Sequence, residues 1–228
     1  MGLCRHGEHL HRLTRQGWVN VYLVREDDDL TVVDTAIRGS AKRILAAAAE
    51  LGAPIRRVIL THDHPDHGGS VDALLAAAPG VELMLSAREA RLARGDRTLD
   101  PGEPEPMKGR YVRFSAPVAR ELEPGERVGS LEVVAAPGHT PGQVAFLDTR
   151  DRTLIAGDAF TTFGRVATSA ELYWRFPLAT SATWHKPTAV ASARALRALD
   201  PSRLAVGHGP VIENPGAAMD AAIARVSG

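Results

Sequence analysis

Short runs of apolar residues, separated by polar turns, alternate along this chain with longer alanine-rich stretches. Short runs flanked by turn residues are typical of strands, and longer amphipathic stretches are typical of helices. In the first half we predict strands over residues 18–24, 30–34, 57–60 and 81–85, and helices over 40–51, 70–78 and 87–94. The charged turn at 25–29 makes the first two strands a hairpin.

The second half repeats this theme. We predict strands over residues 126–129, 131–135, 143–148, 153–156 and 203–206, and helices over 187–199 and 215–226. Residues 1–10 are expected to be a frayed leader or an edge strand. Gly, Pro and charged residues dominate an irregular connection near 94–115, which is either a linker or a lid. Strands that alternate with helices predict an α/β fold with mixed sheets.

Length and composition narrow the class of protein. With 228 residues, the chain has room for one sizeable core, so we expect a single domain over residues 1–228. The fractions of hydrophobic (44%) and charged (24%) residues are typical of a globular protein. Lys plus Arg and Asp plus Glu both number 27, so the chain lacks the basic field of a nucleic-acid-binding protein.

Nothing in the sequence predicts export or membrane insertion. No apolar run reaches the length of a membrane span, and the His- and Arg-rich start is unlike a secretory signal. The one cysteine, Cys4, excludes an internal disulfide framework and suits a reducing compartment. We therefore expect a cytoplasmic protein that acts on a small molecule. The sequence leaves the oligomeric state of the protein open.

The densest chemistry lies in a strand-to-helix loop, where His62, His64, Asp66 and His67 fall within six consecutive residues. Side chains two apart in an extended segment point the same way, so His62 and His64 can face one metal ion together. Asp66 and His67 are adjacent and point in different directions, which lets them reach a second ion. A polar surface loop is the alternative, but such loops seldom carry so many ligand types together.

This motif, His62-x-His64-x-Asp66-His67, resembles the HxHxDH signature of the metallo-β-lactamase superfamily. The resemblance implies three further ligands on later strand-end loops, and the chain has a match for each: His139, Asp158 and His208. It also implies the αβ/βα sandwich of that fold, in which helices flank two mixed β-sheets.

The resemblance also implies how the ligands are shared between two divalent ions. His62, His64 and His139 would hold the first ion, Asp66, His67 and His208 the second, and Asp158 would bridge them. Imidazole and carboxylate donors favour zinc, with iron or manganese as alternatives. In this family an aspartate at the position of Asp34 lies near the metals, so Asp34 is a candidate to orient a histidine ligand; capping its own loop is the alternative.

These ligands predict a dinuclear metal-dependent hydrolase that uses a metal-bridging hydroxide on an ester, thioester or lactone. Asp66 is also expected to orient the hydroxide. The alternatives are an iron-dependent persulfide dioxygenase, a phosphodiesterase and a non-catalytic metal-binding sensor. Aromatic residues crowd the stretch after Asp158, as either ordinary packing or the wall of a substrate pocket. They include Phe160, Phe163, Tyr173, Trp174 and Phe176.

Departures from the subfamilies narrow the substrate. Asp158 stands where one main group of β-lactamases has a cysteine ligand, which disfavours antibiotic hydrolysis. Glyoxalase II enzymes read HTPGH, whereas this chain has Gln143 in place of the second histidine. Acyl-homoserine lactonases place a tyrosine three residues after the bridging aspartate, and here that residue is Thr161.

Overall fold

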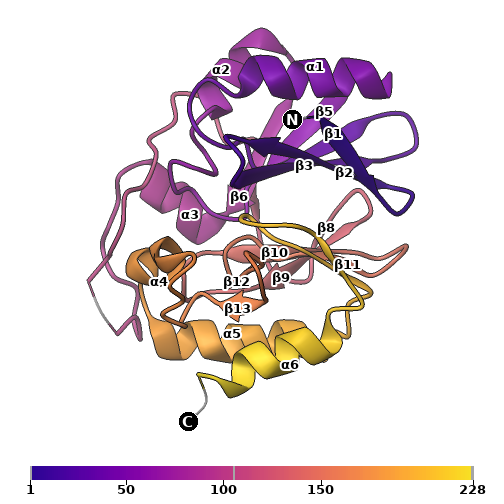
Figure 1. The fold of residues 1–228 in the computed structure, drawn as a ribbon. Coiled ribbons are helices and arrows are strands. Elements are labelled where there is room, and N and C mark those ends of the chain that lie inside the picture. Colours follow the sequence, from indigo (N-terminus) through magenta and orange to yellow (C-terminus); the bar gives the residue numbers. More distant parts are fainter. Residues whose placement is uncertain (1, 105, 227–228) are drawn as a thin grey trace. The chain divides into compact units, whose positions relative to one another are not determined.

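The computed structural model of the chain describes residues 2–104 and 106–226, and its strands form two large mixed sheets and a two-stranded ribbon. Contacts group the chain into two units. Unit 1 comprises Met1–Asp96 and Arg110–Leu122, and unit 2 comprises Arg97–Gly109 and Glu123–Gly228. Each unit carries one large sheet with its own helices, as the sequence predicts (Figure 1).

The sheet of unit 1 has seven strands that follow one another in chain order. Neighbours from β1 to β4 pair antiparallel, and neighbours from β4 to β7 pair parallel. The strands are β1 (Leu3–His6), β2 (Leu10–Arg15), β3 (Val19–Arg25), β4 (Leu30–Val33), β5 (Ile55–Ile59), β6 (Glu82–Ser86) and β7 (Arg120–Leu122). Parallel neighbours need crossover connections, and these contain α1 (Ala41–Leu51), α2 (Val71–Ala77) and α3 (Ala87–Ala93).

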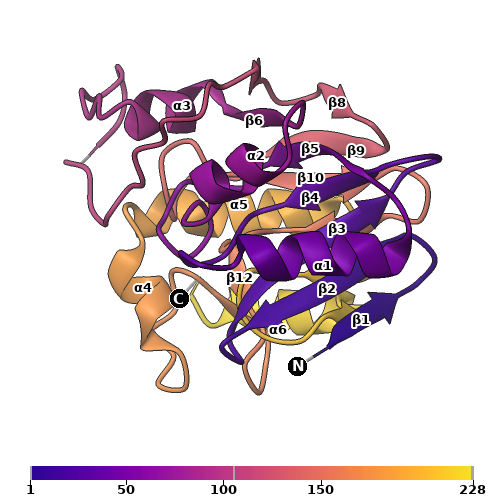
Figure 2. The same cartoon turned by 90° about the horizontal axis from the view of Figure 1, so that it is seen from above.

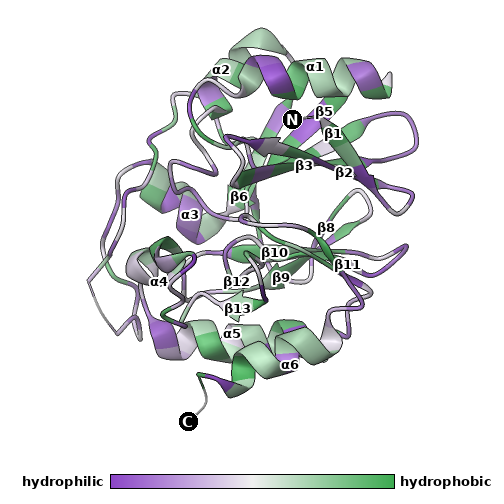
Figure 3. Cartoon of the chain, viewed as in Figure 1, coloured by the Kyte–Doolittle hydropathy of each residue, from purple (hydrophilic) through white to green (hydrophobic). Residues whose placement is uncertain are grey.

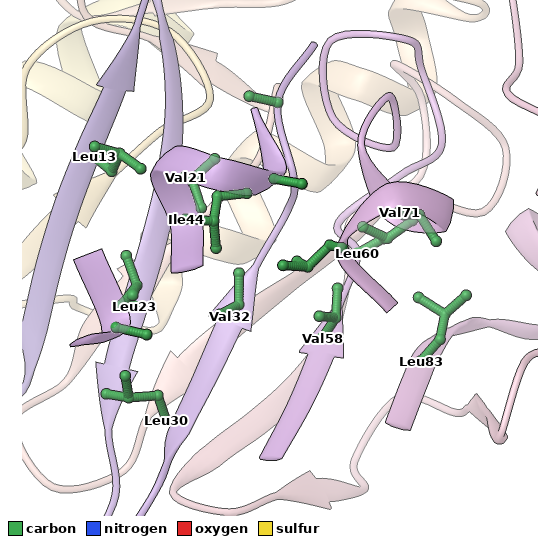
Figure 4. Close-up of a cluster of buried hydrophobic side chains, with 14 of the residues drawn as sticks. Leu13, Val21, Leu23, Leu30, Val32, Ile44, Val58, Leu60, Val71 and Leu83 are labelled. Carbon is green, nitrogen blue, oxygen red and sulfur yellow. The ribbon is translucent and has the colours of Figure 1, made fainter. Parts of the chain in front are cut away.

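One face of this sheet is covered by α1 and α2, and α1 runs across β2 and β3 (Figure 2). Alternate strand residues such as Val21 and Leu23 point to that face, because side chains two apart share a side of a strand. Ile44 of α1 packs among them and is fully buried (Figure 4). This packing fixes the ends of the strands, and the candidate ligand loop begins at one of these ends.

Unit 2 has a six-stranded sheet in the order β15-β14-β11-β10-β9-β8. Its strands are β8 (Arg127–Val128), β9 (Leu131–Ala135), β10 (Val144–Asp148), β11 (Thr153–Ile155), β14 (Arg203–Ala205) and β15 (Ile212–Glu213). The ribbon pairs β12 (Phe160–Thr161) with β13 (Ala167–Thr168). The helices are α4 (Pro177–Ala182), α5 (Lys186–Ala198) and α6 (Gly216–Ala224).

Helices α5 and α6 lie side by side in unit 2. Leu196 of α5 and Met219 of α6 are fully buried in a cluster that also contains Leu154 and Leu204 of the sheet. Figure 3 shows the hydrophobic colour concentrated on the strands and on parts of these helices, with hydrophilic colour in the turns. The alanine-rich helix α6 buries Met219 and Ala222 in this cluster.

Each strand and helix predicted from the sequence has a counterpart. The helix predicted over 40–51 is α1, and Gly52 ends it in a left-handed conformation with φ 67°. Residues 1–10 contain β1 at the edge of its sheet, which confirms the edge-strand alternative. The pattern of apolar residues does not predict β2, β7, β12, β13, β15 and α4.

The missed elements are short or break the expected period. The ribbon strands have only two residues each, too few for any periodic pattern. In β2 the apolar residues Leu10 and Leu13 are three apart rather than two, and His11 between them is buried. Backbone pairing with β1 and β3 on both sides determines that strand, and a single-sequence pattern does not show such partners.

The irregular connection is present as predicted: residues 94–104 and 106–119 contain no helix or strand. The chain contributes Arg97–Gly109 to unit 2 and then returns to unit 1 at Arg110. The single domain over residues 1–228 and the choice between linker and lid stay predictions. None of the helices in the described part of the chain is long and apolar enough to cross a membrane.

We expect Ile44→Ala to lower the free energy of unfolding by about 2–5 kcal/mol, because it empties a fully buried position between α1 and its sheet. Urea denaturation followed by circular dichroism measures this change. Arg43→Ala, on the exposed face of the same helix, is the matched control and is expected to change stability by less than about 0.5 kcal/mol. Equal effects of the two substitutions would contradict this assignment of the core face.

Candidate metal centre

The first group of candidate ligands lies on the loop after β5 in unit 1. His62, His64 and His67 are buried, and Asp66 is half-buried. The ring centroid of His62 lies 4.8 Å from that of His64 and 4.0 Å from that of His67. The metal-binding atoms of Asp66 and His67 lie within 4.8 Å of each other. The structure therefore brings these four residues together on one short loop.

Strand pairing places Asp34 beside this loop. Strands β4 and β5 run parallel with Val33 opposite Ile59, so they end at the same edge of the sheet. Asp34 follows β4 directly, and its Oδ1 accepts a hydrogen bond from the backbone N–H of Thr61 at 2.8 Å. Asp34 is only 2% exposed and adopts a left-handed backbone conformation with φ 63°. Aspartate tolerates this region better than most residues, and a strained residue at a strand end is typical of functional sites.

The Asp34 carboxylate orients two histidines. His67 Nδ1 lies 2.8 Å from Asp34 Oδ2, and a carboxylate can only accept, so this nitrogen carries the proton. The Thr61 hydroxyl donates to the same carboxylate at 2.9 Å and therefore accepts from His62 Nδ1 at 3.1 Å. Both rings then present an Nε2 lone pair, which is what a metal ligand needs.

The loop itself has little freedom. The backbone N–H and hydroxyl of Thr35 both donate to the carbonyl oxygen of His67, at 2.6 and 2.9 Å. A Cβ on Gly69 would lie 2.2 Å from the carbonyl oxygen of Pro65, so no larger residue fits there. The glycine allows the chain to fold back closely on the ligand loop, which keeps His67 in place.

A buried glutamate also supports this loop. Glu89 is fully buried, and its Oε2 accepts a hydrogen bond from the backbone N–H of Asp63 at 3.0 Å. Ser86 and Glu89 have the spacing of a capping box, in which the glutamate side chain would bond back to the start of the helix. Half of that box is present, because the N–H of Glu89 donates to Ser86 Oγ at 3.2 Å, but the carboxylate reaches the ligand loop instead.

The second group of candidate ligands is in unit 2. Strands β11 and β14 run parallel with Ile155 opposite Ala205, so their carboxyl ends also meet at one edge. Asp158 and His208 each lie three residues beyond this pair. The backbone N–H of Gly207 donates to the carbonyl oxygen of Gly157 at 2.9 Å, which holds the two loops together.

His139, Asp158 and His208 converge within unit 2, and all three are buried. Asp158 Oδ2 lies 3.4 Å from His139 Nε2 and 3.1 Å from His208 Nε2. Two ligand atoms bound to one tetrahedral ion at about 2.1 Å lie about 3.4 Å apart. The donor atoms thus have the right chemistry and nearly the right separations for adjacent positions around a metal ion.

Gln143 connects two of these ligand loops. Its Nε2 donates to the carbonyl oxygen of Ala136 at 3.2 Å, and its Oε1 accepts from the backbone N–H of Asp158 at 3.3 Å. In the sequence, Gln143 stands out only as a departure from a subfamily motif. The structure gives it a supporting role, since its buried amide can both donate and accept.

The loop that carries His139 packs tightly against α5. Gly138 has φ 133°, and a Cβ at this position would lie 2.3 Å from the backbone nitrogen of Ala189. The hydroxyl of Ser192 donates to the carbonyl oxygen of Pro137 at 2.6 Å. Glycine is therefore required in this turn for both its backbone conformation and its lack of a side chain.

The aromatic residues after Asp158 have different environments. Phe160 is fully buried in the core cluster of unit 2, and Tyr173 and Phe176 are also buried. The ring centroid of Phe176 lies 4.7 Å from that of His208 and 5.1 Å from that of Phe163. The tyrosine is covered by the Arg165 guanidinium, 4.5 Å from its ring centroid. Phe176 thus contacts a candidate ligand directly.

Comparison with known proteins identifies the family. The model of the metallo-β-lactamase superfamily matches residues 15–208, most of the chain. The chain belongs to the metallo-β-lactamase superfamily. Its matched span includes Asp34 and all seven candidate ligands. Mixed sheets flanked by helices are the fold of this superfamily, so the predicted fold class is confirmed. Its His and Asp ligands bind divalent metal ions.

Three known proteins show what this chain is similar to in sequence or in structure. An uncharacterized protein of Bacillus subtilis, YobT, is 44% identical over 91% of this chain and 90% of its own length. A hydroxyacylglutathione hydrolase of Acidiphilium cryptum is 32% identical over 85% of this chain and 65% of its own length. The structure of TTHA1623 in a di-iron-bound form has a TM-score of 0.66 at 26% identity, and the match covers 89% of this chain and 93% of that one.

We expect Asp34→Asn to lower the affinity for divalent metal by about 10–100-fold, because an amide holds the protonated Nδ1 of His67 less well than a carboxylate does. Asparagine tolerates the left-handed backbone of this position, so the fold should survive. Competition with a chromophoric chelator measures the affinity.

Asp29→Asn is the matched control for that substitution. Asp29 forms an ion pair with Arg57 at 2.9 Å in the same unit and contacts no candidate ligand. Its substitution should leave metal affinity unchanged. If both variants bound metal as tightly as the wild-type protein, Asp34 would have no role in orienting the histidines.

Proposed function

We propose that this chain is a dinuclear metal-dependent hydrolase of an ester, thioester or lactone. The observation that carries the proposal is that buried histidines in both units have their Nδ1 atoms held by neighbouring oxygens, which directs Nε2 toward a metal. We assign His62, His64 and His139 to one ion, Asp66, His67 and His208 to the other, and Asp158 to a bridging position. Membership of the superfamily supports joining the two ligand groups into one centre.

The chemistry follows from these residues. Bound divalent metals would supply a Lewis acid for the carbonyl and an activated water near neutral pH. Asp66 is half-buried, and we propose that its carboxylate also accepts a hydrogen bond from the attacking water and orients it. The one cysteine, Cys4, is exposed on β1, so a thiol nucleophile is not part of this proposal.

Zinc is the metal we propose first, since imidazole and carboxylate ligands suit it. The same donors also accept iron, and the similar protein TTHA1623 has been solved in a di-iron-bound form. That observation supports one alternative, an iron-dependent oxygenase acting on a persulfide. Oxygen uptake with glutathione persulfide by the iron-loaded protein, without hydrolysis of any acyl substrate, would favour this alternative.

We propose that the substrate carries an acyl group and that the bond to its carbonyl carbon is hydrolysed. The relative from Acidiphilium cryptum, named for hydrolysis of hydroxyacylglutathione, supports a thioester within this substrate class. Next to the buried Phe176, three apolar side chains stand in solvent: Leu172 and Trp174 are each 77% exposed, and Leu178 is 56% exposed. Phe176 itself contacts the His208 ring, and the three exposed residues flank it in the sequence as the apolar surface of this segment. The Arg175 guanidinium lies 4.9 Å from the Trp174 ring centroid and is its cationic neighbour there. We propose that this surface receives the apolar part of the substrate.

We expect the metal-loaded wild-type protein to contain two divalent ions per chain and to hydrolyse at least one of a p-nitrophenyl ester, a glutathione thioester and a γ-lactone. His64→Ala and Asp158→Ala should each abolish turnover and lower metal content, because each removes a proposed ligand. Elemental analysis after dialysis and initial-rate assays measure these outcomes, and circular dichroism checks folding.

The choice of variants also tests whether the two ligand groups share one centre. His64 belongs to unit 1 and Asp158 to unit 2. A shared centre predicts that substitution of the bridging carboxylate removes metal from both groups. His9→Ala, which changes a histidine outside either group, should keep full metal content and rate. A wild-type protein with less than one tightly bound ion and no turnover would contradict the proposal.

The apolar surface predicts a dependence on acyl chain length. Each buried methylene is worth about 0.8 kcal/mol, or about fourfold in kcat/KM, so p-nitrophenyl hexanoate should exceed the acetate. Trp174→Ala should remove most of this gain while leaving the rate on acetate nearly unchanged. Leu99→Ala, another exposed apolar residue of unit 2 outside this segment, is the control and should keep the gain. An equal chain-length profile in all three proteins would rule this surface out.

A further inference from the structure

Thr183 contacts a proposed metal ligand from a distant part of the chain. It follows α4 directly, 44 residues after His139, and it is only 3% exposed. Its Oγ1 lies 3.0 Å from Nδ1 of His139, on the side of the ring away from Asp158. No motif or periodic pattern in the sequence singles out this threonine.

The other contacts of this hydroxyl fix the direction of that hydrogen bond. Thr183 Oγ1 lies 2.7 Å from the carbonyl oxygen of Ala179 and 3.1 Å from that of Ser169. A hydroxyl has one proton, and a carbonyl oxygen can only accept, so the proton is directed to one of these two carbonyls. Toward the imidazole the hydroxyl is therefore an acceptor, and Nδ1 of His139 carries a proton.

The neighbouring backbone holds the same loop. The N–H of Trp184 donates to the carbonyl oxygen of His139 at 3.0 Å, and the N–H of His185 donates to that of Gly138 at 2.9 Å. Three consecutive residues thus hold both the main chain and the ring of His139. On the other side of the ring, Nε2 lies 3.4 Å from Asp158 Oδ2, so the contact with Thr183 is the one that favours a proton on Nδ1.

We propose that Thr183 is a positioning residue that keeps His139 in the Nδ1–H tautomer, so that Nε2 is the nitrogen available to a metal ion. This inference rests on the proposed function for the assignment of His139 as a ligand. It goes further by naming the side chain that determines which ring nitrogen of that ligand carries the proton. Supporting partners of this kind are typically worth about 10–100-fold in metal affinity.

The test compares Thr183→Val, which keeps the shape of the side chain but removes its hydroxyl, with Thr183→Ser, which keeps the hydroxyl. Long-range ¹H–¹⁵N NMR of the metal-free protein, at a pH where imidazole is neutral, reports the tautomer of His139. We expect Nδ1–H in the wild-type protein and in Thr183→Ser, and loss of this preference in Thr183→Val. Zinc affinity by chelator competition should fall about 10–100-fold in Thr183→Val and return in Thr183→Ser.

Thr180→Val is the matched control. Thr180 is also a buried threonine at α4, and its hydroxyl donates to the backbone carbonyl of Glu171 rather than to a histidine. This variant should keep the wild-type tautomer and affinity, whatever it does to stability. If Thr183→Val does not fold, Thr183→Ala serves in its place.

The two levels of this proposal fail in different ways. An unchanged His139 tautomer and unchanged zinc affinity in Thr183→Val would overturn the role of Thr183. Absence of metal binding in the wild-type protein would overturn the proposed function, while the tautomer measurement, made without metal, would still decide what Thr183 does. Equal loss of affinity in Thr180→Val and Thr183→Val would also overturn the role, because it would indicate a general loosening of α4.

Discussion

One buried carboxylate orients the histidine rings of the candidate ligand loop in unit 1. Asp34 accepts hydrogen bonds from the Thr61 backbone, the Thr61 hydroxyl and His67 Nδ1. The same hydroxyl accepts a hydrogen bond from Nδ1 of a second histidine, His62. A carboxylate that is only 2% exposed costs folding free energy unless its oxygens accept hydrogen bonds. Here the Thr61 backbone, the Thr61 hydroxyl and His67 supply them. The same contacts that stabilise the charge also orient the rings, so stability and preparation for metal binding are not separable at this position.

Both units use parallel strand pairs to bring distant residues to one edge. In unit 1 the pair β4 and β5 places Asp34 against Thr61, and in unit 2 the pair β11 and β14 places Asp158 near His208. Parallel strands end at the same edge, so residues that follow them become neighbours whatever the length of the crossover. The ligands themselves sit on loops, but the pairing of the strands limits where those loops begin.

The candidate ligands could be selected from the sequence because they lie in short motifs on loops that follow predicted strands. His62, His64 and His67 stand within one dense cluster, and the helices around them have clear patterns and stop signals. The supporting residues could not be predicted in this way. Glu89 reaches Asp63 across 26 positions and Thr183 reaches His139 across 44, and both contacts depend on tertiary packing rather than on local pattern.

Tertiary pairing also explains the strands that the sequence pattern does not predict. Strand β2 is held by partners on both sides, and the ribbon of β12 and β13 has two residues a strand, so pairing rather than periodicity defines them. Gln143 is another example, because its two amide contacts join the His139 loop to the Asp158 loop only after both have folded. Local sequence specifies where the ligands stand, and packing specifies how they are held.

The path of the chain between the two units has a consequence for how the protein can be divided. Unit 1 is discontinuous: its last strand, β7, is supplied after the chain has already contributed Arg97–Gly109 to unit 2. A fragment that stops at Asp96 would leave the outer side of β6 without its partner, exposing unpaired backbone groups. No single cut therefore separates the two units, because a cut after β7 that keeps the sheet of unit 1 whole leaves Arg97–Gly109 of unit 2 on the other piece.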